Sequence, residues 1–218
     1  MMDNVWNDIH GSRIWGEYPE SAVIRFIARN YYHCSQRDKI RILDFGCGAG
    51  AHTWYLAREG FDTYAFDGAK SAVDNTIKKL ESMHLSAHVT VQDGTKIDYE
   101  KNYFDCVVDS ACIYANKKDD ITTMYENIYN VLKPSGKLLT ICFGEELDGY
   151  RTGREIEQGT YCDIRQGALS NRGIAHIFTP EELTELLQHI GFCNIRYDTV
   201  KYTDEGSMVH QYIFNAEK

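Results

Sequence analysis

The chain has 218 residues, of which 43% are apolar and 25% are charged, and its formal net charge is −9. This length and composition fit one globular domain with a large core and exclude a disordered or fibrous chain. The acidic balance argues against a broad nucleic-acid interface, so we expect no nucleic-acid partner.

The cysteines and the N-terminus indicate the compartment. The seven cysteines are odd in number and form no Cys-x-x-Cys pair, which predicts free thiols in a reducing cytoplasm and no zinc site. Residues 1–10 lack the apolar stretch of a signal peptide, and no window is long enough to span a membrane. We expect a cytoplasmic protein with no membrane partner, whose oligomeric state the sequence leaves open.

The first two thirds of the chain alternate short apolar runs with amphipathic segments. Residues 1–20 have no clear period, and together with a helix over 21–31 they form an expected N-terminal cap over 1–33. The predicted strands cover 40–43, 63–66, 87–91, 103–108 and 137–143, and the helices between them cover 51–59, 71–83 and 119–132. This alternation predicts a doubly wound, mostly parallel sheet.

The last third departs from that pattern and then returns to it. Residues 144–178 show no period, which indicates a functional insert, here expected as a substrate lid. Thr179-Pro180-Glu181-Glu182 is a capping box that starts a helix ending at Gly191. Strands over 193–203 and 209–216 predict a C-terminal antiparallel hairpin. The predicted fold is a single α/β domain over 1–218 with a seven-stranded, Rossmann-like sheet.

The stretch Asp44-Phe45-Gly46-Cys47-Gly48-Ala49-Gly50 joins the first strand to the next helix. Alternating glycines allow a sharp turn with positive φ angles. The N–H groups at the start of the helix, beside its positive dipole end, favour a nucleotide-type ligand. Aspartates also end the next three strands, where such sheets bind ligands; they are Asp67, Asp93 and Asp109.

A dinucleotide site is the rival interpretation of this turn. The dinucleotide fingerprint is G-x-G-x-x-G, whereas the spacing here is G-x-G-x-G. Asp44 would oppose a pyrophosphate electrostatically but would suit a ligand with an amine. Asp67 fits a ribose-binding acid about 20 residues after the first glycine.

Five segments in order resemble the class I S-adenosylmethionine-dependent methyltransferases, of the type that acts on small molecules. They cover roughly residues 40–143 and are 44–50, 66–67, 91–94, 102–109 and 132–138. The C-terminal helix and hairpin resemble the end of that family's fold. The resemblance implies S-adenosylmethionine as the cofactor and methyl transfer as the reaction.

The resemblance also implies a role for each part of the turn. Gly46 and Gly48, with Cys47 between them, would let the backbone approach the methionine part of the cofactor. Asp44 would help to hold its ammonium group, directly or through water. Asp67 would accept hydrogen bonds from both ribose hydroxyls.

The remaining implied contacts surround the adenine and the sulfur. Asp93 would accept from the adenine amino group, with Gly94 and Thr95 adjacent and Gly68 beside the ring. The stretch Asp109-Ser110-Ala111 would pass near the methionine carboxylate and sulfonium and contact them through backbone groups. Trp15 would either cover the cofactor or anchor the N-terminal helix.

The acceptor site is less defined by sequence. His176 is a candidate general base, but Ile174, His176 and Phe178 alternate as one strand face, so a packed histidine is the alternative. Tyr114 would either flank the sulfonium or belong to the core. We expect methyl transfer to a small molecule; the alternatives are an NAD-dependent oxidoreductase and a non-catalytic module that binds S-adenosylmethionine.

Overall fold

The computed structural model describes residues 5–12 and 16–218. Seven strands form one sheet in the order β3-β2-β1-β4-β5-β10-β9. The first five strands of that order pair in parallel, and β10 is antiparallel to both neighbours. The strands are β1 Arg41–Phe45, β2 Asp62–Asp67, β3 His88–Val91, β4 Phe104–Ser110, β5 Leu132–Phe143, β9 Cys193–Asp204 and β10 Ser207–Glu217. The predicted doubly wound sheet with its C-terminal hairpin is confirmed.

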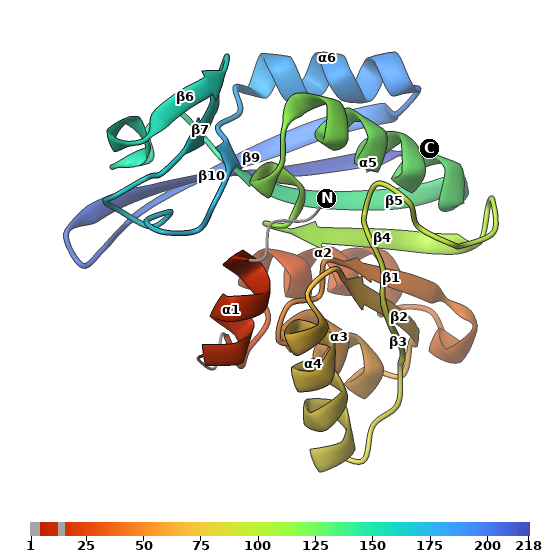
Figure 1. The fold of residues 1–218 in the computed structure, drawn as a ribbon. Coiled ribbons are helices and arrows are strands. Elements are labelled where there is room, and N and C mark those ends of the chain that lie inside the picture. The colour runs from red at the N-terminus through yellow and green to blue at the C-terminus, as the bar shows by residue number, and fades with distance from the viewer. Residues whose placement is uncertain (1–4, 13–15) are drawn as a thin grey trace.

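Helices cover both faces of this sheet (Figure 1). On one face lie α2 Ser21–Tyr31, α3 Ala51–Arg58 and α4 Lys70–Ser82, and on the other lie α5 Lys118–Val131 and α6 Pro180–Ile190. Strand β1 pairs with β2 on one side and with β4 on the other. The strand order therefore reverses between β1 and β4. Within the described residues, no helix combines the length and apolarity needed to cross a bilayer.

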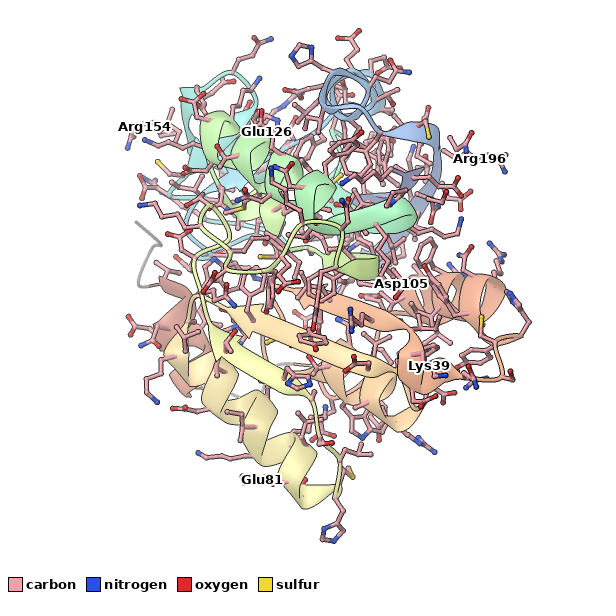
Figure 2. All side chains as sticks on the ribbon, turned by 90° about the vertical axis from the view of Figure 1, so that its right-hand side faces the viewer. Lys39, Glu81, Asp105, Glu126, Arg154 and Arg196 are labelled. Carbon is pink, nitrogen blue, oxygen red and sulfur yellow. The ribbon has the colours of Figure 1, made fainter. Side chains whose placement is uncertain are left out.

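Two apolar clusters hold the layers together. The larger lies under α5 and α6 and includes the fully buried rings of Phe45, Tyr125 and Phe214. The smaller lies under α2 and α3 and includes Ile27 and Leu56. Charged side chains on the outside extend away from these clusters, as the labelled Glu81, Glu126, Arg154 and Arg196 show in Figure 2. The central strands β1 and β4 are therefore buried on both faces, as a parallel sheet requires, while the edge strands β3 and β9 stay largely exposed.

Helix α6 has the ends that its sequence predicts. The Thr179 hydroxyl accepts a hydrogen bond from the backbone N–H of Glu182 at 3.1 Å, with Pro180 in the first turn. Gly191 ends the helix with a φ of 117°. The N-cap half of the predicted capping box is therefore present and fixes where α6 begins, while the Glu182 carboxylate accepts from Lys118 and lies against His176.

The insert after β5 is more regular than its sequence indicates. Strands β6 Arg154–Glu157, β7 Thr160–Cys162 and β8 Ala175–His176 form a separate antiparallel sheet, preceded by the 3-10 turn Tyr150–Thr152. The prediction of an irregular segment is wrong over these residues, because strands of two to four residues are too short to show a period.

Two further local predictions need correction. Residues Val5–Ser12 form a helix, α1, which packs against α4 and was not predicted. Residues 133–136, in the segment 132–138 named above, fall within β5 but interrupt its pairing with β4, since the register shifts there and Ser135 has a φ of 64°. Backbone bonds from Ser135 N–H to Lys218 O and from Lys218 N–H to Gly136 O, at 2.9 and 3.0 Å, hold this bulge against the C-terminus.

Candidate active site

The turn between β1 and α3 requires glycine. Gly46, Gly48 and Gly50 have φ angles of 72°, 52° and 79°, in the left-handed region that side chains disfavour. A Cβ atom on Gly46 would overlap the side chain of Cys112, and one on Gly50 would lie 2.7 Å from Thr76 Oγ1. The turn therefore has no side chains at these three positions, because of its φ angles and the close packing of Cys112 and Thr76.

Asp67 joins the end of β2 to this turn. One carboxylate oxygen accepts the Gly48 N–H at 2.9 Å, and the other accepts the Ala69 N–H at 2.8 Å. Burial raises the pKa of Asp67, and the Ala69 and Gly48 amides oppose that rise. Each oxygen has a further lone pair, so the carboxylate is held rigidly and can still accept from a ligand.

Asp93 occupies the equivalent place after β3. Its Oδ1 accepts two hydrogen bonds, from the Thr95 N–H at 2.9 Å and from the Thr95 hydroxyl at 2.7 Å. Burial works against ionisation, but these Thr95 donors lower the pKa of Asp93. Gly94 beside it lies against Phe45 and Met124, where an added Cβ would lie 3.0 and 3.1 Å from their side chains. An acceptor oxygen and an apolar wall thus occur together.

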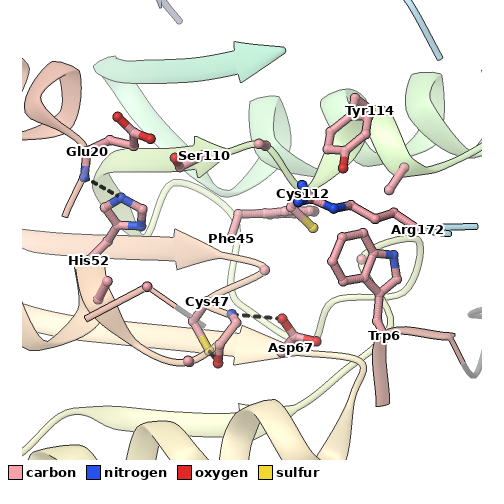
Figure 3. A pocket seen from close by; sticks show the side chains of 18 of the residues that line it. Trp6, Glu20, Phe45, Cys47, His52, Asp67, Ser110, Cys112, Tyr114 and Arg172 are labelled. Atoms are coloured by element: carbon pink, nitrogen blue, oxygen red, sulfur yellow. Dashed lines mark hydrogen bonds between the residues drawn. The ribbon is translucent and has the colours of Figure 1, made fainter. Parts of the chain in front are cut away.

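One cavity of about 380 Å³ connects these features. It lies beyond the carboxyl ends of β1, β2 and β4, and Figure 3 shows the side chains around it. The predicted site residues that line it are Gly46, Cys47, Gly48, Asp67, Gly68, Asp93, Gly94, Thr95, Ser110 and Tyr114. Trp15 lies outside the described residues. Segments far apart in sequence therefore converge on one space.

Asp44 does not line this cavity. Its side chain is 1% exposed, and Oδ2 accepts from the Thr53 hydroxyl at 2.6 Å. Among the described residues, Oδ1 has no hydrogen-bond partner. Burial raises the pKa of Asp44 to about 7. The expectation that Asp44 contacts a ligand ammonium directly therefore needs correction. The Asp44 side chain points from β1 into the interior and lies behind the turn.

Asp109 is likewise buried behind the site. Its Oδ1 accepts the N–H groups of Cys112 and Ile113 at 2.9 and 3.2 Å, and its Oδ2 accepts the Thr140 hydroxyl at 2.6 Å. Burial raises the pKa of Asp109 to about 6. The carboxylate shapes the chain after β4 and leaves Ser110, the next residue, to face the cavity.

His176 is a correction of a different kind. It is 1% exposed and does not line the cavity. Its Nδ1 lies 2.7 Å from Thr160 Oγ1, and its Nε2 lies 3.2 Å from Glu182 Oε2. Glu182 also accepts from Lys118 Nζ at 2.8 Å. With both ring nitrogens engaged away from the cavity, the predicted general base is a packed residue that ties the insert to α5 and α6.

Tyr114 does line the cavity. Its ring packs edge-on against Phe143, with centroids 4.8 Å apart, and it is 2% exposed. Burial raises the pKa of Tyr114, which keeps its hydroxyl protonated at neutral pH. Tyr114 therefore belongs to the core and also lines the cavity, and its proximity to the sulfonium stays a prediction.

Three lining residues escaped the sequence reasoning as site residues. Trp6 comes from α1, Arg172 from the insert and His52 from the first turn of α3 (Figure 3). Nε2 of His52 accepts the Glu20 N–H at 3.2 Å, and burial lowers its pKa to about 4. His52 is therefore neutral, with its proton on Nδ1. The position of His52 just after the glycine turn is the one sequence signal that could have identified it as a cavity-lining residue. No local sequence pattern identifies Trp6 or Arg172 as such.

The fold and the carboxylates at its strand ends define a Rossmann-like protein that binds a nucleotide-type cofactor. Residues 42–136 match the model of a methyltransferase domain. A putative methyltransferase of Geobacillus (strain WCH70) is 26% identical over 129 residues, 58% of this chain and 52% of the relative. Putative methyltransferase YqeM of Bacillus subtilis (strain 168) is 30% identical over 111 residues, 50% and 44% of the two chains. The chain thus spans about half the length of these curated relatives.

Solved structures agree with this. The crystal structure of an S-adenosylmethionine-dependent methyltransferase from Methanosarcina mazei has a TM-score of 0.70 and 25% identity, covering 82% of this chain and 92% of its own. The fold of a Burkholderia thailandensis 1,6-didemethyltoxoflavin-N1-methyltransferase matches with a TM-score of 0.66 at 22% identity, covering 91% and 79%. In the sequence of residues 42–136 and in its fold, the chain is thus similar to the class I S-adenosylmethionine-dependent methyltransferases, and these matches support S-adenosylmethionine as the cofactor.

Proposed function

We propose that the chain transfers a methyl group from S-adenosylmethionine to a small-molecule acceptor. The observation that carries the proposal is that one cavity is lined both by Asp67 and Asp93 and by Tyr114 and Arg172. When bound, the cofactor supplies a methyl group on a sulfonium, whose leaving group is a neutral thioether. The chain itself need only bind, orient and exclude water.

The cofactor roles follow from the positions of the lining residues. Gly46, Cys47 and Gly48 provide bare backbone for the methionine part. Asp67 would accept from the two ribose hydroxyls with the lone pairs that Gly48 and Ala69 leave over. Hydrogen bonds to a charged acceptor contribute about 1.5–3 kcal/mol each, so this carboxylate dominates cofactor affinity.

The adenine end uses a second carboxylate. Asp93 would accept from the adenine amino group through Oδ2, since Thr95 occupies Oδ1. Gly68, Gly94 and Thr95 lie around the ring position, with Phe45 giving an apolar surface there. Ser110 marks the passage from the cofactor side to the acceptor side.

No general base is assigned to the reaction. Positioning alone supplies up to about 7–11 kcal/mol in favourable cases, and methyl transfer creates no anion on the leaving group. Residues 5–12 and the insert over 144–178 contribute Trp6, Ala168 and Arg172 to the cavity, which supports their roles as cap and lid. Enclosure on these two sides limits the exposure of the reacting atoms to water.

Three features favour a small acceptor. The cavity has the size of a ligand pocket, and the chain is acidic. Relatives also act on small molecules: one, phosphoethanolamine N-methyltransferase 2 of Caenorhabditis elegans, is 25% identical over 162 residues, 73% of this chain and 34% of its own.

Two measurements test the proposal. Isothermal titration calorimetry is expected to show binding of S-adenosylhomocysteine and none of NADH; preferential NADH binding would contradict it. Labelled methyl from S-adenosylmethionine is then offered with a cell extract separated into small-molecule, protein and nucleic-acid fractions. We expect label in the small-molecule fraction, and label confined to a macromolecular fraction would refute the acceptor class.

A further inference from the structure

His52 keeps one ring nitrogen free beside the cofactor cavity. Its Nε2 accepts the Glu20 N–H at 3.2 Å, and among the described residues its Nδ1 has no hydrogen-bond partner. The imidazole lines the cavity and is partly buried. Burial lowers its pKa to about 4, so the ring is neutral near pH 7 and its proton lies on Nδ1. The cavity therefore has an oriented N–H donor, which none of the contacts proposed for Asp67 and Asp93 uses.

The carboxylate of Glu20 is a second group without a partner. Glu20 lines the same cavity, and within the described part of the chain its side chain makes no hydrogen bond or ion pair. Its charge raises the pKa of His52, against the larger effect of burial. The Glu20 N–H holds the imidazole, so the two side chains lie on the same side of the cavity (Figure 3). A hydrogen-bond donor and a negative charge therefore occur together.

This pair lies across the glycine turn from the ribose side of the site. In Figure 3, Cys47 separates His52 from Asp67, whose carboxylate accepts the Gly48 N–H at 2.9 Å. A cofactor with its ribose at Asp67 and its chain along the turn would carry its amino-acid end toward His52. That end has an ammonium and a carboxylate on one carbon. His52 offers a donor for the carboxylate, and Glu20 offers a charge for the ammonium.

Two further observations agree with this placement. Asp44, predicted to hold the ammonium, is buried behind the turn, which leaves the ammonium without its expected acid. His52 lies in the first turn of α3, where the backbone N–H groups favour a carboxylate. Glu20 would repel that carboxylate but attract the ammonium on the same carbon, so the pair suits a zwitterion and not a lone anion.

We infer that His52 and Glu20 bind the amino-acid end of the cofactor, with the Nδ1–H of His52 donating to the carboxylate and Glu20 facing the ammonium. This inference rests on the proposed function and adds two residues that hold its cofactor. The expected effect is on cofactor affinity, and it should vanish for an analogue that lacks the amino-acid end.

Calorimetry with two cofactor analogues tests this inference. S-adenosylhomocysteine has the amino-acid end, whereas methylthioadenosine keeps the adenosine and the sulfur without it. His52→Gln loses the Nδ1 donor, so its affinity for S-adenosylhomocysteine should fall at least about tenfold. In Glu20→Gln the fall should be about threefold, because Glu20 is exposed. Affinity for methylthioadenosine should stay unchanged in both variants, which also shows that they fold.

His52→Asn is the rescue variant. An asparagine amide places its donor near the position of Nδ1, whereas a glutamine amide reaches the position of Nε2. His52→Asn should therefore bind S-adenosylhomocysteine more tightly than His52→Gln does. The reverse order would place the contact at Nε2 and contradict the inference.

The control is His33→Gln, at an exposed position that does not line the cavity. Its affinity for both analogues should equal that of the wild type. Equal losses for the two analogues in His52→Gln, or no loss for S-adenosylhomocysteine, would overturn the inference. So would a wild type that binds the two analogues equally well. A wild type that binds neither would refute the proposed function, and this inference with it.

Discussion

The two halves of the site are held together in different ways. On the cofactor side, the carboxylates of Asp67 and Asp93 are fixed by backbone N–H groups, from Ala69 and Thr95 two residues further on and from Gly48 in the turn after β1. On the lid side, the link from the insert to α6 runs between side chains, through Thr160, His176 and Glu182. Contacts made by backbone groups recur in every chain that forms the same turn. Contacts between side chains need those particular residues and are therefore specific to one chain.

This difference explains where the family resemblance lies. The matched family model ends at residue 136, before the insert begins. The cofactor is common to the family, so its half of the site can be shared. The acceptor differs between relatives, so the half that holds it is free to change. Experiments on each half should therefore have different outcomes.

The largest effect is expected from Asp67→Ala. The change removes the proposed acceptor for two ribose hydroxyls, at about 1.5–3 kcal/mol each, and frees the amides that shape the turn. The dissociation constant for S-adenosylhomocysteine should rise at least about 100-fold in calorimetry. Asp74→Ala is the control, since that exposed carboxylate on α4 forms an ion pair with Lys70 on the same helix. A loss below about tenfold for Asp67→Ala would place the ribose elsewhere.

Gly46→Ala tests the turn itself. The new methyl would overlap Cys112 in addition to adopting a φ of 72°, so we expect a loss of about 2–4 kcal/mol in urea unfolding. Gly60→Ala is a matched control, because Gly60 has a φ of 84° and nothing within 4 Å of an added Cβ. It should lose only about 1 kcal/mol of backbone strain. Equal losses in the two variants would mean that Cys112 moves aside freely.

The sequence predicts the cofactor half because its determinants are local. Glycines at alternate positions require a turn, and the acids at the ends of parallel strands must meet at one edge. Even so, the sequence did not show that the side chains of Asp44 and Asp109 are buried behind the site, while Ser110 lines the cavity. Strand-end position identifies the correct edge of the sheet but does not separate a side chain that faces the ligand from one that packs behind it. That distinction depends on the alternation of each strand within the buried sheet.

The lid half was predicted only as a location. The irregular pattern after Phe143 correctly marked where the site continues, but it concealed three strands and the place of Arg172. Which side chain of such a segment reaches the cavity depends on long-range contacts, such as Gly149 packed against the Gln166 carbonyl. His176 looked reactive in sequence because its partners, Thr160 and Glu182, are not adjacent to it.

His176→Leu separates a structural role from a catalytic one. The substitution removes one of the two partners of the Thr160 hydroxyl, the other being Glu157, and removes a partner of Glu182, so we expect a loss of about 2 kcal/mol in urea unfolding. Well below the unfolding transition, the pH profile of methyl transfer should keep its shape. His189→Leu, at an exposed position of the same helix that follows the insert, should stay within about 0.5 kcal/mol of the wild type. Loss of turnover without loss of stability would restore His176 as a base.

The smallest expected effect is the loss of stability at low pH through Glu182. Burial raises the pKa of Glu182, but His176 and Lys118 together lower it to about 2, from an ordinary value of 4.5. A carboxylate with a depressed pKa in the folded state stabilises the fold above its unfolded pKa and loses that contribution as the pH falls through its folded pKa. The side chain is 34% exposed, so the contribution should stay below about 1 kcal/mol. In urea unfolding, the difference in free energy of unfolding between wild type and Glu182→Gln should therefore shrink as the pH falls from 5 toward 3, by at most about 1 kcal/mol. Glu181→Gln, in the same helical turn, controls for the helix dipole. A parallel pH trend in that variant would show that the dipole, and not the link from the insert to α5 and α6, stabilises this end of the lid.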